Sequence, residues 1–119
     1  MFNIVKIGEK DVPMLCMAST DLYYRNIFHR DAIKLQTGDI DEGDLINFVC
    51  EMGFVMAKFA ELKDRKKMLC LNEDVYLEWL DQFERADYIN ALPDIRRTYE
   101  GQQIGESDAK KNKDEPSES

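Results

Sequence analysis

The chain has 119 residues, of which 44% are hydrophobic and 34% are charged, and its formal net charge at pH 7 is −8. This length fits one domain with one modest core. The acidic balance argues against binding to nucleic acid or to an anionic membrane surface, because both need clustered lysine and arginine.

The first predicted element is a β-hairpin. Residues 2–7 (FNIVKI) and 12–17 (VPMLCM) are strand-like runs, and the polar stretch GEKD, which begins at Gly8, joins them as a four-residue turn. Even-numbered residues of the first run share one face and odd-numbered residues the other. Pro13 cannot donate to a strand ladder and predicts an edge strand. An isolated hairpin is marginal in water, so we expect helices to pack on it.

The next segment has the periodicity of a helix. Apolar residues recur at spacings of three and four from Tyr23 to Leu35. Residues 19–21 (STD) can cap the start of this helix, and Gly38 is expected to end it.

A long second helix is predicted to begin at Asp41 or Glu42, whose carboxylates suit a helix N-terminus. It carries a continuous apolar stripe. Gly53 within it costs about 1 kcal/mol relative to alanine, so we expect another helix to make close contact there. The basic stretch KDRKK, which begins at Lys63, is expected to close this helix, because cations suit its negative end.

Two further helices are predicted after residue 71. Asn72 can cap the third helix, and we expect that helix to break between Asn90 and Pro93. Pro93 suits the first turn of a short fourth helix, which Gly101 would stop.

The sequence therefore predicts a mainly α fold with a short N-terminal β-hairpin (α+β), in which three to four helices pack on the hairpin. We expect the folded domain to span residues 1–101. Residues 102–119 are polar, and we expect a disordered tail, because this composition cannot bury enough apolar area to offset the entropy of ordering.

No catalytic or metal-binding residue is predicted. His29 is the only histidine and lies beside charged residues, so we expect it at the solvent edge and not as a catalytic base. The three cysteines are far apart, whereas zinc sites need close pairs of soft ligands, and we expect reduced, buried thiols in the cytosol. The acidic stretch that begins at Asp39 has its glycine at the wrong position for a calcium loop and lacks the closing glutamate. No cofactor motif, signal peptide or membrane span is apparent.

Two compositional features are typical of partner binding. Methionines are adaptable apolar contacts. Ten aromatic residues lie within about 65 positions, and a hairpin and three helices are not expected to bury all of them. Exposed aromatic side chains would mark an interface; the alternative is that all of these residues fill the core. The predicted partner-binding residues, taken as exposed apolar positions, are Tyr23, Met52, Phe54, Met56 and Trp79.

Three stretches, in this order, resemble the small tail assembly chaperones of long-tailed, siphovirus-type phages and related prophages. They are VKIGEKDVPMLCMASTDLYYRNIFHRDAIK (5–34), NFVCEMGFVMAKFA (47–60) and YLEWLDQFERADYINALPDI (76–95). The family pattern is a hairpin of the form I-G-x-K-x-V-P, a small-residue and Thr-type cap, LYYRxIFxRD, a long helix ending in VMAK, and a WL helix. The likeness covers about residues 3–96, and it departs from the pattern at His29, where a small residue such as glycine is expected.

The resemblance implies a protein that is not an enzyme, has no cofactor and binds the tape measure protein, a very long helical chain that sets tail length. Such a chaperone keeps that chain soluble until tail tube subunits polymerise around it. Several copies coat one tape measure chain, so self-association is implied. Its place is the cytoplasm of the bacterial host, and it is not expected in the mature virion.

Many members of the family also have a longer form, made by a programmed frameshift near the end of the gene. The triplet Lys110, Lys111, Asn112 could be encoded by the slippery sequence A-AAA-AAC. The hypothesis is that the tail then links this domain to a module that recruits tail tube protein; the alternative is an ordinary chain terminus.

Two other functions stay open from the sequence. One is a generic acidic helical adaptor, or a phage-encoded regulator, that binds another protein. The other is a small enzyme with an unrecognised pair of acids. Mimicry of nucleic acid is disfavoured, because acidic and basic residues are interspersed along the predicted helices.

Overall fold

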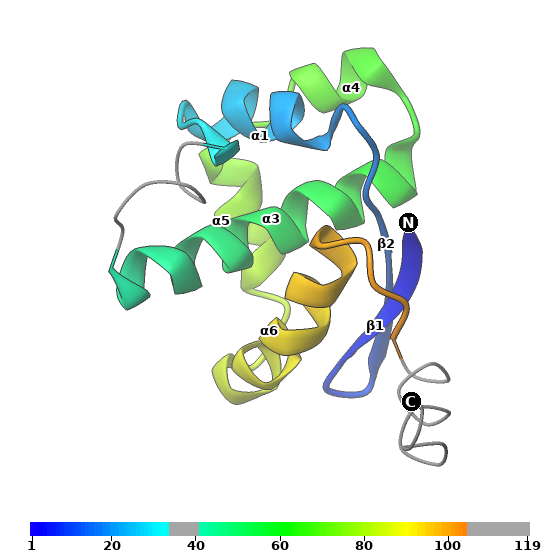
Figure 1. Ribbon diagram of the computed structural model, residues 1–119, viewed down its shortest axis with the longest axis vertical. Helices are drawn as coiled ribbons and strands as arrows, with labels where there is room; N and C mark the ends of the chain where they lie inside the picture. Colours follow the sequence, from blue (N-terminus) through cyan, green and yellow to red (C-terminus); the bar gives the residue numbers. More distant parts are fainter. Residues whose placement is uncertain (34–40, 105–119) are drawn as a thin grey trace, which may run out of the picture.

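The computed structural model describes residues 1–33 and 41–104 (Figure 1). Within these residues an N-terminal two-stranded antiparallel hairpin is followed by five helices packed on it. The elements are β1 (Phe2–Ile7), β2 (Lys10–Leu15), α1 (Thr20–Phe28), α3 (Glu42–Leu62), α4 (Arg65–Leu69), α5 (Glu73–Leu80) and α6 (Arg85–Tyr99). The predicted fold class is confirmed, with the short α4 as an additional helix. The predicted tail lies outside the described residues from position 105 onward.

The hairpin is tighter than expected. Ile7 pairs with Lys10, so the turn is only Gly8 and Glu9, and the rest of the GEKD stretch belongs to β2. Gly8 has a φ of +63°, the conformation that the first position of a two-residue hairpin turn requires and that glycine adopts without steric cost. In β1 burial alternates strictly, as predicted, with the odd-numbered residues facing the helices.

The first helix ends earlier than predicted. α1 stops at Phe28, and His29 takes the left-handed conformation (φ 59°) while its N–H donates to the carbonyl of Arg25 over 2.8 Å. The chain then turns toward α3, where Arg30 pairs with Glu51. Gly38, the expected end of the helix, lies outside the described residues.

α3 crosses the middle of the molecule, with α1 and α4 on one side and α6 on the other (Figure 1). Its predicted start is confirmed, because the Asp41 side chain accepts a hydrogen bond from the backbone N–H of Asp44 over 2.8 Å. The close contact expected at Gly53 is also confirmed. A Cβ atom there would lie 2.6 Å from the Tyr88 hydroxyl of α6.

The basic stretch closes α3 at its first residue, as predicted, but its later residues form a new helix. Lys63 adopts a left-handed conformation (φ 49°) and ends α3, and the Asp64 side chain then accepts a hydrogen bond from Lys67 N–H to cap α4. The sequence prediction did not include α4, which forms because an aspartate among the cations provides a new N-cap.

The prediction of a helix break between Asn90 and Pro93 was wrong. α5 begins at its predicted cap, Asn72, but ends at Leu80, and α6 then runs through Pro93. Proline removes one helical hydrogen bond, and the buried face of α6 offsets this loss. The end of α6 is as predicted: Gly101 (φ +81°) donates to Thr98 O, and Gln102 donates to Arg97 O, which is a Schellman motif.

Candidate functional site

The residues predicted to be exposed for a partner are all buried. Met52, Phe54 and Met56 are 0% exposed, and Tyr23 and Trp79 are 8% exposed. The prediction of their exposure was wrong because β2, α1, α5 and α6 cover α3 at this level, and Tyr23 and Trp79 pack against α3 from α1 and α5. A role of these five residues in partner binding stays a prediction. In the free chain they are part of the hydrophobic core.

Most of the aromatic residues form one connected cluster in that core, and Tyr23 and Phe59 form a separate pair. The Phe54 ring lies 5.3 Å from the Tyr76 ring and 5.6 Å from the Trp79 ring, and Trp79 in turn contacts Phe83 and Tyr88. Most of these pairs are edge-to-face or tilted, the geometries that the ring quadrupoles favour. The core therefore uses the aromatic excess that had suggested an interface.

A polar cluster joins the end of α1 to α3. The Tyr24 hydroxyl donates to Glu51 Oε1 over 2.7 Å, and Arg30 pairs with the other carboxylate oxygen. Burial, and then the hydrogen bond to Glu51, raise the pKa of Tyr24. A hollow of about 370 Å³ lies beside this cluster. Because the buried Glu51 carboxylate is already paired with Tyr24 and with the exposed Arg30, the cluster has a structural role.

Metal-ligating side chains and thiols are further candidates for a functional site. In the two described segments, no group of three or more His, Cys, Asp or Glu side chains could hold a metal ion. Cys16 and Cys50 are half-buried, and burial raises the pKa of both thiols, which keeps them protonated and weakly nucleophilic. Cys70 is exposed, so the expectation of a buried thiol was wrong there. His29 is exposed, as predicted.

An apolar depression lies between the first turns of α3 and the second half of α6. We call it the α3–α6 groove; its volume is about 410 Å³. Ile46, which is 42% exposed, projects from the α3 side. The groove is lined by Glu42, Leu45, Ile46, Val49, Leu92, Pro93, Arg96, Arg97, Glu100 and Gln102.

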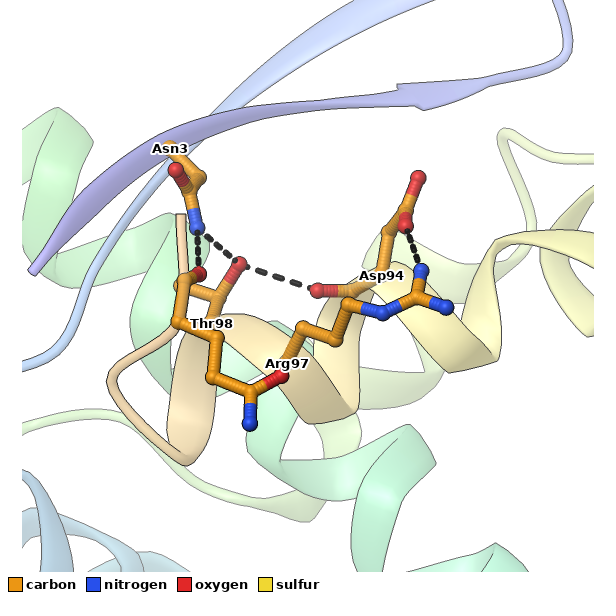
Figure 2. A network of polar contacts seen from close by, with 5 residues as sticks. Asn3, Asp94, Arg97 and Thr98 are labelled. Atoms are coloured by element: carbon orange, nitrogen blue, oxygen red, sulfur yellow. Dashed lines mark hydrogen bonds and ion pairs between the residues drawn. The ribbon is translucent and has the colours of Figure 1, made fainter. Parts of the chain in front are cut away.

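A buried polar network fixes the α6 wall of this groove (Figure 2). Asn3 of β1 donates from Nδ2 to Thr98 Oγ1 and to Gln102 O, both over 2.9 Å, and Thr98 Oγ1 donates to Asp94 O over 3.0 Å. Asn3 is 4% exposed and Thr98 is 0% exposed. The hairpin therefore holds the last turns of α6 in place, and the groove is bounded by fixed helices.

A second apolar surface is the outer face of the hairpin. Phe2 and Ile4 are 49% and 54% exposed, and Ile4 pairs across the strands with the exposed Pro13. At the turn end of this face Lys6 and Asp11 form an ion pair of 3.3 Å. Sheet faces with exposed apolar residues are candidate contact surfaces.

Sequence reasoning missed the groove residues, although one signal was present. Leu45 and Ile46 are consecutive apolar residues in the first turns of a helix, so they cannot both face the same way. Leu45 is half-buried and Ile46 is exposed. Pro93 was assigned to a helix start, which hid its position on the exposed side of α6.

No family model matches the chain, and neither a curated protein nor a solved structure matches it. The likeness to tail assembly chaperones therefore depends on the sequence motifs alone. Over residues 1–33 and 41–104, every helix is too short or too polar to cross a membrane.

Proposed function

We propose that this chain is a tail assembly chaperone of a long-tailed phage or prophage, which binds the tape measure protein and keeps it soluble while the tail tube assembles around it. The observation that carries the proposal is the ordered run of three motif stretches within residues 3–96. A hairpin followed by helices is the architecture that these motifs imply, and it is the architecture found.

The backbone at position 29 adds independent support. The family pattern favours a small residue such as glycine there, and His29 has a φ of 59°. Glycine is the residue that adopts this left-handed conformation without steric cost. The one departure from the pattern therefore falls at a position whose geometry explains the family preference.

The surface chemistry is also consistent with a chaperone. The α3–α6 groove and the outer face of the hairpin offer apolar contacts on two sides, one for an apolar client and one for a further copy of this chain. A net charge of −8 helps to keep a chaperone–client complex dispersed.

The wider proposal follows from the same resemblance. The protein acts without catalysis or a cofactor in the cytoplasm of the bacterial host, and it is absent from the mature virion. A longer, frameshifted form recruits tail tube protein. The gene sequence tests this last part: lysine codons AAG-AAG at positions 110 and 111 would contradict a slippery site.

Co-expression with the tape measure protein of the same genome tests the function. We expect the tape measure protein to move from the insoluble to the soluble fraction and to copurify with several copies of this chain. Co-expression with an unrelated acidic protein is the control. An insoluble tape measure protein beside folded, abundant chain would contradict the proposal and leave an adaptor or regulator of another protein as the better account.

A further inference from the structure

We infer that the α3–α6 groove is the docking site for a single amphipathic helix of a protein partner, whose apolar stripe is flanked by lysine or arginine. The inference depends on the shape, the charge and the rigidity of the groove. If the helix belongs to the tape measure protein, as the proposed function implies, the groove is where this chain holds its client.

The shape of the groove suits a helix. Apolar residues from both walls form its floor, with Leu45, Ile46 and Val49 on α3 and Leu92 and Pro93 on α6. Recognition of an amphipathic helix uses side chains at spacings of three and four inserted into a hydrophobic groove between two elements. Ile46 and Pro93 are exposed in the free chain, so docking would remove them from water.

The cations of the groove are already neutralised within α6. Arg96 Nε lies 3.1 Å from Glu100 Oε2, and Arg97 Nη1 lies 2.6 Å from Asp94 Oδ1. These pairs follow the helical spacings of three and four and keep the guanidinium groups beside carboxylates of their own helix. The α6 wall therefore does not favour an acidic ligand.

The α3 wall is acidic. Glu42 lines the groove and makes no ion pair with any other described residue, whereas Asp44 of the same turn lines the hollow beside Tyr24. The carboxylate of Glu42 outweighs the partial positive charge of a helix N-terminus, which is roughly half a unit. A helix with basic residues beside its apolar stripe would complement this wall and the overall charge of −8.

A second copy of this chain suits the groove less well, because it carries the same net charge of −8 and like charges oppose association. The groove also needs little reorganisation on binding. The network of Asn3 and Thr98 fixes one wall (Figure 2), and α3 is anchored by its buried middle. A fixed site loses less entropy on binding than a mobile one.

The test uses the full chain and two synthetic helical peptides of roughly 18 residues, or five turns. Both carry the same leucine stripe, with lysine flanks in one and glutamate flanks in the other. In NMR titrations we expect the lysine peptide to shift signals of residues 42–49 and 92–97. We also expect it to bind about tenfold more tightly than the glutamate peptide, and to weaken as salt is added.

Variants locate the site. Ile46→Lys should weaken binding of the lysine peptide by about tenfold or more, because it places a cation on the apolar floor. Leu77→Lys is the matched control: Leu77 on α5 is 55% exposed and does not line the groove, so this change should leave binding unaltered. The change Glu42→Gln, which removes the groove carboxylate without an ion pair, should bring the two peptides to within about threefold of each other.

Several results would overturn the inference. These are equal binding of both peptides, no binding of either, or signal shifts confined to other surfaces. If the NMR signals of the groove residues shift with protein concentration in the absence of peptide, the groove binds a second copy of this chain, and this result would also overturn the inference. The groove and the function fail separately: Ile46→Lys that still solubilises the tape measure protein contradicts the groove, whereas peptide binding by a chain that cannot solubilise it contradicts the function.

Discussion

Two parts of α3 differ sharply in what surrounds them. Residues 42–47 are exposed or half-buried, and Glu42, Leu45 and Ile46 among them line one wall of the α3–α6 groove. Residues 51–57 are all buried, including Gly53 and the charged Glu51. One helix therefore serves as a surface at its start and as the centre of the core in its middle. The difference arises because the hairpin, α1 and α5 surround only the middle part.

The comparison teaches that aromatic and methionine content does not by itself mark an interface. The middle of α3 holds Phe54, Met52 and Met56, which contact other elements of the same chain. Its first turns hold aliphatic residues that have no such cover. Candidate binding residues are therefore the apolar residues that other elements of the chain do not cover. The following predictions distinguish the first turns of α3 from its buried middle.

The largest effect is expected from Phe54→Ala. Phe54 is fully buried between aromatic rings, and removing a buried phenyl group costs about 3–5 kcal/mol of unfolding free energy. Urea denaturation followed by circular dichroism measures the loss. The matched change Ile46→Ala, in the exposed first turns of the same helix, should alter stability by about 0.5 kcal/mol or less. Equal losses for both variants would contradict the division of α3.

Alkaline pH should destabilise the buried part. An unfolded tyrosine ionises near pH 10, whereas burial raises the pKa of Tyr24 and of Tyr88 in the folded chain. Their contribution to stability is complete below about pH 10. It is then lost as the pH rises toward the folded values, by up to about 1.4 kcal/mol per pH unit for each tyrosine.

Urea denaturation between about pH 8 and pH 11 measures this slope, with tyrosinate absorbance as the second signal. Tyr24→Phe and Tyr88→Phe should each make the slope shallower. If all five tyrosines ionise while the circular dichroism spectrum stays native, the buried phenols are not protected as described.

The two glycines of α3 provide a finer comparison. Gly53→Ala places a methyl group 2.6 Å from the Tyr88 hydroxyl, which donates to Cys50 O over 2.6 Å, and overpacking of this kind costs about 1–3 kcal/mol. Gly43→Ala meets Asp41 Oδ1 only at 3.4 Å and should be neutral or stabilising by up to about 1 kcal/mol. Thermal denaturation of both variants measures the contrast, and a stabilising Gly53→Ala would contradict the close contact.

The smallest effect is expected at His29, outside both parts of α3. A non-glycine residue in the left-handed region is strained by roughly 1–2 kcal/mol. His29→Gly should therefore stabilise the fold by about 1 kcal/mol, after the extra entropy of glycine in the unfolded chain is subtracted. His29→Ala, which keeps the Cβ atom, is the control and should show no such gain. A loss of stability in His29→Gly would mean that the imidazole makes a contact that outweighs the strain.

The sequence was sufficient for the local features of the fold. Strand alternation in β1, the caps at Asp41 and Asn72, and the stop at Gly101 each depend on a few neighbouring residues, and all are confirmed. The helix boundaries at Phe28 and Leu80 were missed, because tertiary contacts and competing caps decide them.

The binding residues could not be found from periodicity alone. The run from Phe48 to Ala60 has few polar positions, a pattern of helices buried on all sides. The composition of this run therefore indicated a buried helix, although Met52, Phe54 and Met56 were predicted to be exposed. The groove depends on how α6 lies against α3, and the Asn3–Thr98 hydrogen bond that fixes α6 joins residues 95 positions apart. No local pattern predicts such a contact.

Hydrogen exchange of the chain, alone and in complex with the tape measure protein, tests the central claim most directly. We expect slower exchange in the complex at residues 42–49 and 92–97, with α4 (Arg65–Leu69) unchanged as an internal control. Failure to form a complex, or a complex in which those segments exchange as in the free chain, would contradict the account.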